Sequence, residues 1–192
     1  MISAGNNNLF NHGKGCGSCY QVKCTQNAEC SGYPITVTIT DECPGACNDD
    51  PVHFDLSGKA FGYLAKHGQG DALRNKGRIN IEYQRVQCYY NNTSIIFKID
   101  RGSNQYYLAF ALEGVNGDGE IGSMELIPSS SGQSLHMQPV FGATWKADIP
   151  NGITGSFSVR ITSLESRRTI TAYNSIPANW QPGQYYISNV NF

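Results

Sequence analysis

All seven cysteines of this 192-residue chain lie in its first 88 residues, and residues 89–192 contain none. A cluster of cysteines constrains a fold strongly, because each bridge or metal site fixes the distance between backbone positions. Six cysteines can form the three-bridge framework typical of a secreted domain, which leaves the seventh without a partner in the chain. The abrupt change in cysteine usage therefore predicts two domains.

The chemistry of these cysteines has three interpretations. Cys16 and Cys19 form a C-x-x-C pair, and Cys43 and Cys47 follow further along, a spacing that suits zinc. A C-x-x-C pair is also a redox motif, but the flanking glycines and polar residues do not supply the β-α-β context of thioredoxin-like proteins. We favour structural disulfides over zinc, because three more cysteines lie in the same half of the chain. We assign no metal ligand and no cofactor.

Charge and hydropathy exclude several partners. The net charge is −1 and 15% of the residues are charged, so the chain has no strong field for nucleic acid or an anionic membrane. No stretch approaches the roughly 18 apolar residues of a membrane-spanning helix, and the first ten residues lack the pattern of a signal peptide. Two overlapping glycosylation sequons, which begin at Asn91 and Asn92, nevertheless indicate secretion.

The first half of the chain has the pattern of β-strands and one short helix. Apolar residues alternate with threonine over residues 35–40, and a similar alternation runs through residues 78–88, as in half-buried strands. Residues 56–64 carry apolar side chains at helical spacing instead, with Ser57 as the expected N-cap and Gly68 as the expected end.

The second half has the pattern of β-strands throughout. The sequence NGDG (116–119) has the composition of a tight turn, so a hairpin is expected there. Short strands separated by turn residues suggest a two-sheet antiparallel sandwich. The expected strands are SIIFKID (94–100), YYLAFALEGV (106–115), EIGSMELI (120–127), FGATWKAD (141–148), SFSVRITS (156–163), RTITAY (168–173) and QYYISNV (184–190).

Several motifs together resemble one family. GKGCGSCYQVKC, ITVTITDECP, VHFDLSGKAFG and INIEYQRVQC, followed by YYLAFALEGVNGDGEIGSMEL, FGATWKAD and GSFSVRIT, resemble the plant expansins, and HFDLSGKAFG resembles their β-expansin branch, which includes grass pollen allergens. The resemblance implies an all-β protein. A six-stranded double-psi β-barrel, similar to that of family-45 endoglucanases, is followed by an immunoglobulin-like β-sandwich that binds carbohydrate. We place the barrel at residues 1–93, a linker at 94–105 and the sandwich at 106–192.

The same resemblance implies a pairing of the cysteines. It pairs Cys19 with Cys88, Cys24 with Cys30 and Cys43 with Cys47, and it leaves Cys16 unpaired. Expansins normally begin their barrel with a segment that carries a Thr-x-Tyr-Gly motif and a further cysteine, whereas the present match starts partway into the barrel. We therefore expect a chain that is truncated at its N-terminus and a barrel that is incomplete.

Asp55 resembles the general acid of family-45 endoglucanases, and the family places Asp41 in the same groove. Glycoside hydrolysis needs two carboxylates across the scissile bond, about 5–5.5 Å apart for retention and about 6.5–9.5 Å apart for inversion. Family-45 enzymes take their base from an N-terminal region without a counterpart here, so we expect no hydrolysis. We expect Asp41 and Asp55 to hydrogen-bond sugar hydroxyls, and His53 either to line the groove or to pack. The alternative for Asp55 is a helix-entry acid, while Tyr20 and Tyr33 are expected to fill the barrel.

Flat aromatic side chains are the expected polysaccharide platform of the second domain, because a sugar ring stacks on them through its apolar face. Large apolar residues alternate with Tyr107 along its strand, so Tyr107 is expected to face outward. The resemblance places Trp145 on the binding face, although a lone strand tryptophan is often a core residue. Phe141 and Trp180 have the pattern of core or corner residues, and Lys146 is either a polar contact or simply solvated.

The leading hypothesis is a secreted, extracellular protein of the plant cell wall, of the β-expansin type. It would bind wall polysaccharides as a monomer, with glucuronoarabinoxylan and cellulose as partners, and disrupt their noncovalent contacts without hydrolysis. The second hypothesis is a family-45-like endoglucanase that uses Asp55 as its general acid. The third is an inactive truncated remnant that binds polysaccharide through the second domain alone.

Overall fold

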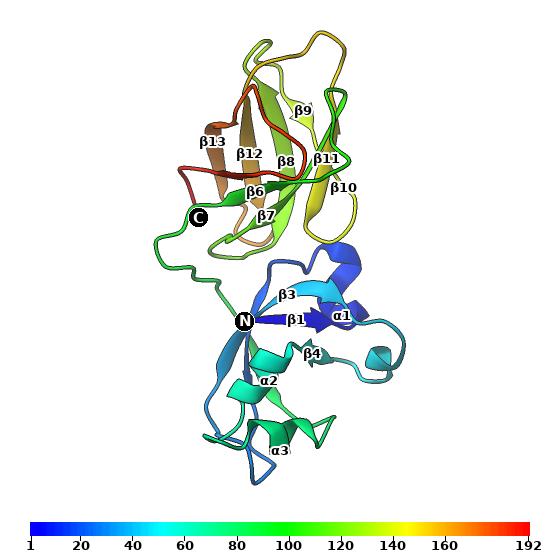
Figure 1. Cartoon of the computed structure of the whole chain (residues 1–192), viewed down its shortest axis with the longest axis vertical. Coiled ribbons are helices and arrows are strands. Elements are labelled where there is room, and N and C mark those ends of the chain that lie inside the picture. Colours follow the sequence, from blue (N-terminus) through cyan, green and yellow to red (C-terminus); the bar gives the residue numbers. More distant parts are fainter. The chain divides into compact units, whose positions relative to one another are not determined.

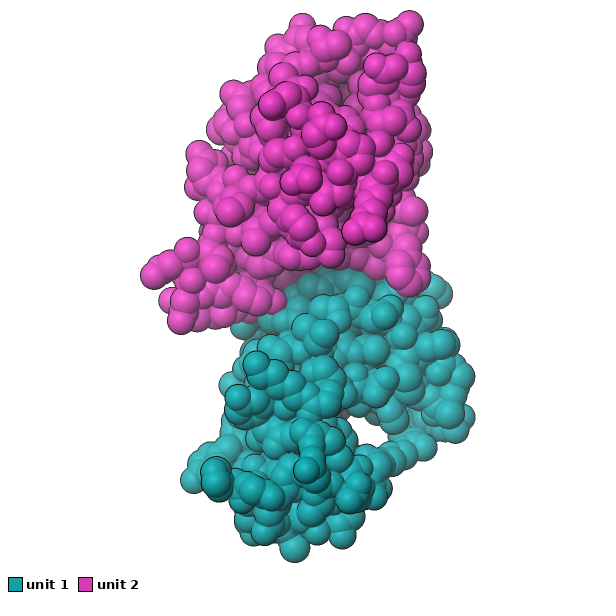
Figure 2. Space-filling view, viewed as in Figure 1, with its two compact units in different colours: residues 1–87 teal, residues 88–192 magenta.

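The computed structural model describes residues 1–192 and separates them into two compact units. Residues 1–87 form unit 1 and residues 88–192 form unit 2 (Figure 2), so the division lies before the expected boundary at residue 93. The loss of cysteines along the sequence marks this division closely, since Cys88 is the first residue of unit 2. None of the helices has the length and apolar composition that crossing a membrane would require.

Unit 1 is built on a five-stranded sheet with the strand order β4-β1-β3-β2-β5 (Figure 1). β1 runs parallel to β3, and the other pairs are antiparallel. The alternation predicted for residues 35–40 is confirmed, because β3 buries Ile35, Val37 and Ile39. The elements are β1 (Ile2–Gly5), α1 (Asn7–Phe10), η1 (Asn11–Gly13), β2 (Cys19–Lys23), β3 (Ile35–Glu42), η2 (Gly45–Asp49), β4 (Phe54–Leu56), α2 (Gly58–Tyr63), α3 (Gly70–Arg74) and β5 (Glu82–Val86).

Aromatic side chains from both edges of this sheet contact one another, although Tyr83 remains 47% exposed. Tyr20 on β2 packs against Phe54 on the edge strand β4, with ring centroids 5.3 Å apart. Phe54 also packs against Tyr83 on the opposite edge strand β5, at 5.4 Å. The sheet therefore curls toward a barrel, with five strands where the resemblance implies six. Tyr20 is partly buried and packs against the core of unit 1, but the prediction for Tyr33 is wrong, because Tyr33 is 77% exposed.

The predicted helix begins at its capping residue and ends early. The side-chain oxygen of Ser57 accepts a hydrogen bond from the backbone N–H of Ala60 at 3.3 Å, which satisfies one of the unpaired donors in the first turn of α2. The helix stops before Gly68, and a second helix, α3, packs beside it. The fully buried side chains of Leu64 and Leu73 join these helices to the core of unit 1.

The cysteines form disulfides, as predicted, and not a zinc site or a redox pair. A sulfur held in a disulfide carries no thiolate charge for zinc. Six residues are bonded, with Cys24 joined to Cys30 and Cys43 joined to Cys47: Cys19, Cys24, Cys30, Cys43, Cys47 and Cys88. Cys16 is the free cysteine, and it is buried.

Unit 2 is a sandwich of two antiparallel sheets (Figure 1). The strand order is β10-β11-β7-β6-β14 in the five-stranded sheet and β13-β12-β8-β9 in the four-stranded sheet. All seven predicted strands occur, and the two-residue strands β9 and β10 were not predicted. The strands are β6 (Ile96–Ile99), β7 (Tyr107–Glu113), β8 (Ile121–Pro128), β9 (Leu135–His136), β10 (Gln138–Pro139), β11 (Thr144–Asp148), β12 (Phe157–Ser163), β13 (Thr169–Ile176) and β14 (Tyr185–Ile187).

Residues 94–105, the predicted linker, belong to the sandwich. They contain β6, which pairs with β7 on one side and with β14 on the other. Phe97 and Ile99 of β6 are buried in the core of unit 2. The turn residues that suggested a linker lie before and after this strand, so they mark its two ends and do not separate two domains.

The turn at residues 116–119 joins the two sheets, so the predicted hairpin is wrong. It connects β7 of the five-stranded sheet to β8 of the four-stranded sheet. The buried side chain of Asp118 in this turn accepts hydrogen bonds through Oδ2 from the backbone N–H groups of Glu165 at 3.1 Å and Ser166 at 2.7 Å. A buried carboxylate thus fixes this turn to the connection between β12 and β13.

We expect Asp118→Ala to lower the free energy of unfolding of the chain by about 1.5–3 kcal/mol, the contribution typical of hydrogen bonds to a charged group. Burial acts to raise the pKa of Asp118, but the hydrogen bonds from Ser166 and Glu165 outweigh it and hold that pKa below 3.8. Because the folded-state pKa is lowered, this contribution is complete above about pH 4 and is lost as the pH falls further.

Urea unfolding near neutral pH and again below about pH 3.5 measures this effect. The difference in stability between wild type and Asp118→Ala should shrink at the lower pH. Asp71→Ala, which removes an exposed acid from unit 1, is the control and should change stability by less than about 1 kcal/mol. A difference that stays constant with pH would contradict the role of the Asp118 charge.

Candidate functional site

Three strands of unit 1 place Asp41 and Asp55 in one row. β1 is the middle strand, and its Ala4 pairs with Asp41 of β3 on one side and with Asp55 of β4 on the other. Paired residues project from the same face of a sheet and neighbouring strands lie about 4.8 Å apart, so the Cα atoms of the two acids lie about 10 Å apart. Both acids are exposed, and only the methyl group of Ala4 lies between them.

An irregularity in the pairing of β3 creates this acid row. Ser3 pairs with Ile39. The next residue of β1, Ala4, pairs with Asp41, so the register skips Thr40. Strict alternation after the buried Ile39 would turn Asp41 inward, whereas a β-bulge re-aims the side chains that follow it. Thr40 and Asp41 are consequently both exposed.

The acid row offers hydrogen-bond acceptors and no donors. Ionised carboxylates accept hydrogen bonds only, and each offers two oxygens to donors such as sugar hydroxyls. Hydrolysis needs carboxylates that act from opposite sides of a scissile bond. Asp41 and Asp55 project from one face of one sheet, so this pair does not supply the opposed arrangement.

The free thiol of Cys16 adds no nucleophile beside this row. Burial, and to a smaller extent the negative charge of Asp41, raise the pKa of Cys16 to about 11. The thiolate is the reactive form of cysteine, and a thiol with such a pKa stays protonated at neutral pH. Cys16 therefore serves as a small apolar residue of the interior.

A buried asparagine holds the loop that leads into β4. The side chain of Asn6, which is 1% exposed, donates hydrogen bonds to the backbone carbonyl oxygens of Asp50 at 3.0 Å and Pro51 at 3.3 Å. The backbone N–H of Asn6 donates to the carbonyl oxygen of His53 at 3.0 Å. These bonds fix the entry of the chain into β4, and therefore the position of Asp55.

His53 contacts the same loop. Its Nδ1 lies 3.6 Å from Oδ2 of Asp50, which also forms an ion pair with Arg78. The hydrogen bond from Arg78 holds the pKa of Asp50 below its ordinary value of 3.8, so Asp50 is ionised at neutral pH. The side chain of His53 is 22% exposed. Of the two roles that the sequence leaves open for His53, these contacts favour packing and positioning.

Sequence analysis missed both Asn6 and β1. One signal was present, because Asn6 precedes an apolar pair and caps α1, where its side-chain oxygen accepts a hydrogen bond from the backbone N–H of Leu9 at 3.4 Å. The bond from Asn6 to Asp50 spans 44 residues and has no local signature. β1 itself is the four-residue segment ISAG, which is too short to show a period.

The outer face of the five-stranded sheet in unit 2 is the second candidate surface. The even-numbered residues 108–112 of β7 are buried in the core, so Tyr107 and Ala109 project outward, as the alternation predicts. β11 places Asp148 opposite Tyr107 and Lys146 opposite Ala109. Lys146 and Asp148 form an ion pair at 2.6 Å. Ala109 is nevertheless only 1% exposed, so the accessible part of this face is formed by Tyr107 and the charge pair.

Trp145 is a core residue, so the prediction that it lies on the binding face is wrong. It is 9% exposed, pairs with Phe110 and packs between the two sheets. Trp145 alternates with Lys146 along β11, and because Lys146 faces outward, Trp145 faces the core. The exposed ring of this segment is Phe141, which is 63% exposed although the sequence predicts a core or corner residue. The aromatic candidates are therefore Tyr107 and Phe141.

Tyr185 is a further aromatic residue on the outer face. It is 54% exposed and pairs with Lys98 of β6, whose Nζ lies 5.5 Å from the centroid of the tyrosine ring. Lys98 in turn pairs with Ala111, which shares a face with Tyr107. A hydrogen bond to Tyr185, together with the charge of Glu113, raises the pKa of Lys98. Sequence analysis missed Tyr185, because two adjacent tyrosines do not reveal which one faces the core.

Comparison with known protein families and sequences covers both units. A family profile described as lytic transglycolase matches residues 2–83, and the profile of the expansin C-terminal domain matches residues 95–177. Expansin-B4 of Arabidopsis thaliana is 52% identical over 193 residues, which cover 100% of this chain and 74% of the relative. Expansin-B1 of Zea mays is 45% identical over 196 residues, which cover 100% of this chain and 71% of the relative.

Solved structures share the fold. The crystal structure of apo-expansin from Clavibacter michiganensis aligns with a TM-score of 0.74 at 20% identity, over 100% of this chain and 82% of that chain. A mutant of the same bacterial protein in complex with cellohexaose aligns with a TM-score of 0.74 at 19% identity, over the same shares of the two chains. At this identity the likeness establishes the fold.

We expect Trp145→Ala to lower the free energy of unfolding by about 3–5 kcal/mol, because it empties a large volume in the core. Phe141→Ala should lower it by less than about 1 kcal/mol, since its ring is exposed, and should instead reduce retention of the chain on insoluble cellulose. Urea unfolding and a cellulose pull-down measure the two properties. A Trp145→Ala variant as stable as wild type would show that Trp145 is not a core residue.

Proposed function

Because the chain belongs to the β-expansins, a branch of the proteins that loosen plant cell walls, we propose that it acts by gripping wall polysaccharides and separating them without cutting a bond. The acid row carries this proposal, since Asp41 and Asp55 project from one sheet face on either side of Ala4. Two carboxylates on residues whose Cα atoms lie about 10 Å apart hold hydroxyl groups on neighbouring sugars or on neighbouring chains.

The separation step is an exchange of hydrogen bonds. Wall chains adhere to one another through neutral hydroxyl–hydroxyl bonds, while a hydroxyl that donates to a carboxylate forms a shorter bond of roughly twice the strength. Asp41 and Asp55 therefore compete successfully for a hydroxyl that has been exposed by thermal motion. No covalent bond changes, so the chains slip under load and pair again elsewhere.

The outer sheet face of unit 2 anchors the protein during this exchange. A sugar ring stacks on Tyr107 through its apolar face, and the exposed ring of Phe141, in the turn before β11, offers a second stacking surface. The cellohexaose complex of the bacterial expansin supports a β-linked glucan as one ligand for this fold. Lys98 and Lys146 on the same face form ion pairs with Glu113 and Asp148, and they can exchange these partners for the acidic branches of glucuronoarabinoxylan, which we propose as the second ligand.

We also propose that the protein is secreted and works as a glycosylated monomer. Asn91 and Asn92 are both exposed in the turn before β6. Mass measurement before and after enzymatic removal of N-glycans, on protein secreted from plant cells, tests this. Thr93→Ala removes the sequon of Asn91 alone, and Ser94→Ala removes that of Asn92 alone. The mass shift should vanish in the double variant, and a wild-type protein without any shift would contradict the proposal.

Asp55→Asn should slow wall extension about ten-fold or more, because an amide loses the charge-assisted hydrogen bond. The measurement uses strips of heat-inactivated grass wall under constant load and records extension and released reducing sugar together. Wild type should extend the strip without a matching rise in sugar. Asp71→Asn, which neutralises an exposed acid on α3, is the matched control and should extend the strip as wild type does.

Two outcomes would contradict the proposal. Sugar released in proportion to extension would identify an endoglucanase with Asp55 as its acid. Retention of the protein on the wall without any extension would identify a polysaccharide-binding protein in which the acid row does not loosen the wall.

A further inference from the structure

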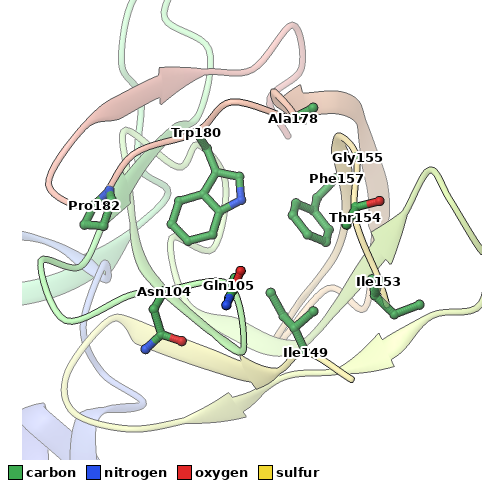
Figure 3. Close-up of a pocket in the computed structure, with 10 residues that line it drawn as sticks. All are labelled: Asn104, Gln105, Ile149, Ile153, Thr154, Gly155, Phe157, Ala178, Trp180 and Pro182. Atoms are coloured by element: carbon green, nitrogen blue, oxygen red, sulfur yellow. The ribbon is translucent and has the colours of Figure 1, made fainter. Parts of the chain in front are cut away.

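Three loops at one end of the unit 2 sandwich surround a pocket of about 250 Å³ (Figure 3). They are the connections from β6 to β7, from β11 to β12 and from β13 to β14. The outer sheet face with its aromatic residues does not form this pocket. The wall-loosening proposal leaves it without a role.

The inner wall of the pocket is apolar and continuous with the core. Phe157 is 2% exposed and Ile149 is 5% exposed. Trp180 packs against the same core, and its indole ring borders the open space opposite Phe157 (Figure 3). A ligand that enters the pocket therefore meets aromatic and aliphatic side chains.

Uncharged polar side chains surround the opening. Asn104, Gln105 and Thr154 are exposed and belong to the lining. The carboxamide of Gln105 projects toward the open space (Figure 3). None of the lining residues carries a charge. The pocket therefore suits a neutral ligand that has both an apolar face and several hydroxyl groups.

Backbone hydrogen bonds hold the walls of the pocket in place. The N–H of Asn104 donates to the carbonyl oxygen of Tyr107 at 2.7 Å, and the side chain of Asn104 accepts from the N–H of Tyr106 at 2.9 Å. The N–H of Ile149 donates to the carbonyl oxygen of Tyr106 at 2.8 Å, which joins two of the three loops. A site formed before its ligand arrives loses little entropy on binding.

We propose that this pocket binds a single neutral sugar residue at the end of a polysaccharide chain or branch. Its volume lies below the roughly 300–1,000 Å³ typical of sites for drug-sized ligands, so it admits one ring and not an oligosaccharide. The ring stacks on Trp180 while its hydroxyls exchange hydrogen bonds with Gln105, Asn104 and Thr154. Unit 2 thus recognises chain ends in the pocket, separately from chain lengths on the flat face.

Tryptophan fluorescence of the full chain gives a direct readout. The chain contains two tryptophans, and Trp145 is sealed in the core while Trp180 borders the pocket. Titration with methyl β-glucoside and methyl β-xyloside should change the emission of wild type saturably, with millimolar dissociation constants. Gln105→Ala should weaken binding about five-fold, the effect of one lost hydrogen bond. Ala178→Phe, which adds a ring at an exposed position of the lining, should abolish it.

Tyr107→Ala is the control that separates this site from the sheet face. It should bind the methyl glycosides as wild type does and bind cellulose less well. Thermal melts confirm that every variant is folded. A wild-type emission change that rises linearly with sugar concentration would overturn the proposal. So would Gln105→Ala and Ala178→Phe variants that bind the methyl glycosides as tightly as wild type does. If either result occurs while wild type still extends walls, only the pocket proposal is refuted. If wild type binds the methyl glycosides saturably but extends no walls, only the wall-loosening mechanism is refuted.

Discussion

The pairing of β1 between β3 and β4 is the constraint on which the acid row depends. The two acids come from different strands, and neither strand pairs with the other. β1 joins them through backbone hydrogen bonds, parallel on one side and antiparallel on the other, and Ala4 sets their separation at two strand spacings. The spacing of Asp41 and Asp55 is thus a property of the sheet, which leaves both side chains projecting from the same face.

Local sequence patterns predicted the elements in which buried and exposed side chains alternate or in which a capping residue marks the end. The alternation over residues 35–40 predicted β3, and Ser57 predicted the start of α2, because each signal acts within a few residues. The register of β1 has no such signal. The skip at Thr40 arises from pairing with a distant strand, and the loop into β4 is held by Asn6 across 44 residues of sequence. The sequence therefore identified the two acids as candidate site residues, but it did not predict β1, the strand that aligns them.

The predictions for Trp145 and Phe141 failed for a related reason. Alternation assigns residues to two faces of a strand, but it does not state which face meets the core. Along β11 the set that contains Trp145 and Ala147 is buried, and the set that contains Lys146 is not. Lys146 was the better guide, because an amine is rarely buried without a partner, whereas a tryptophan is found in both settings. Phe141 lies in a turn, beyond the reach of any alternation argument.

The two sugar-binding geometries proposed for unit 2 would serve different parts of one polymer. A flat face binds a chain anywhere along its length and lets it slide, because each sugar presents the same stacking surface as the last. A pocket that admits one ring binds only where a chain or branch ends, and it fixes that end. Several weak contacts on one chain retain the protein at the wall, while each dissociates fast enough to be exchanged. The proposed wall-loosening mechanism requires this combination, since a single tight site would hold the polysaccharide in place and prevent the slippage proposed for the acid row.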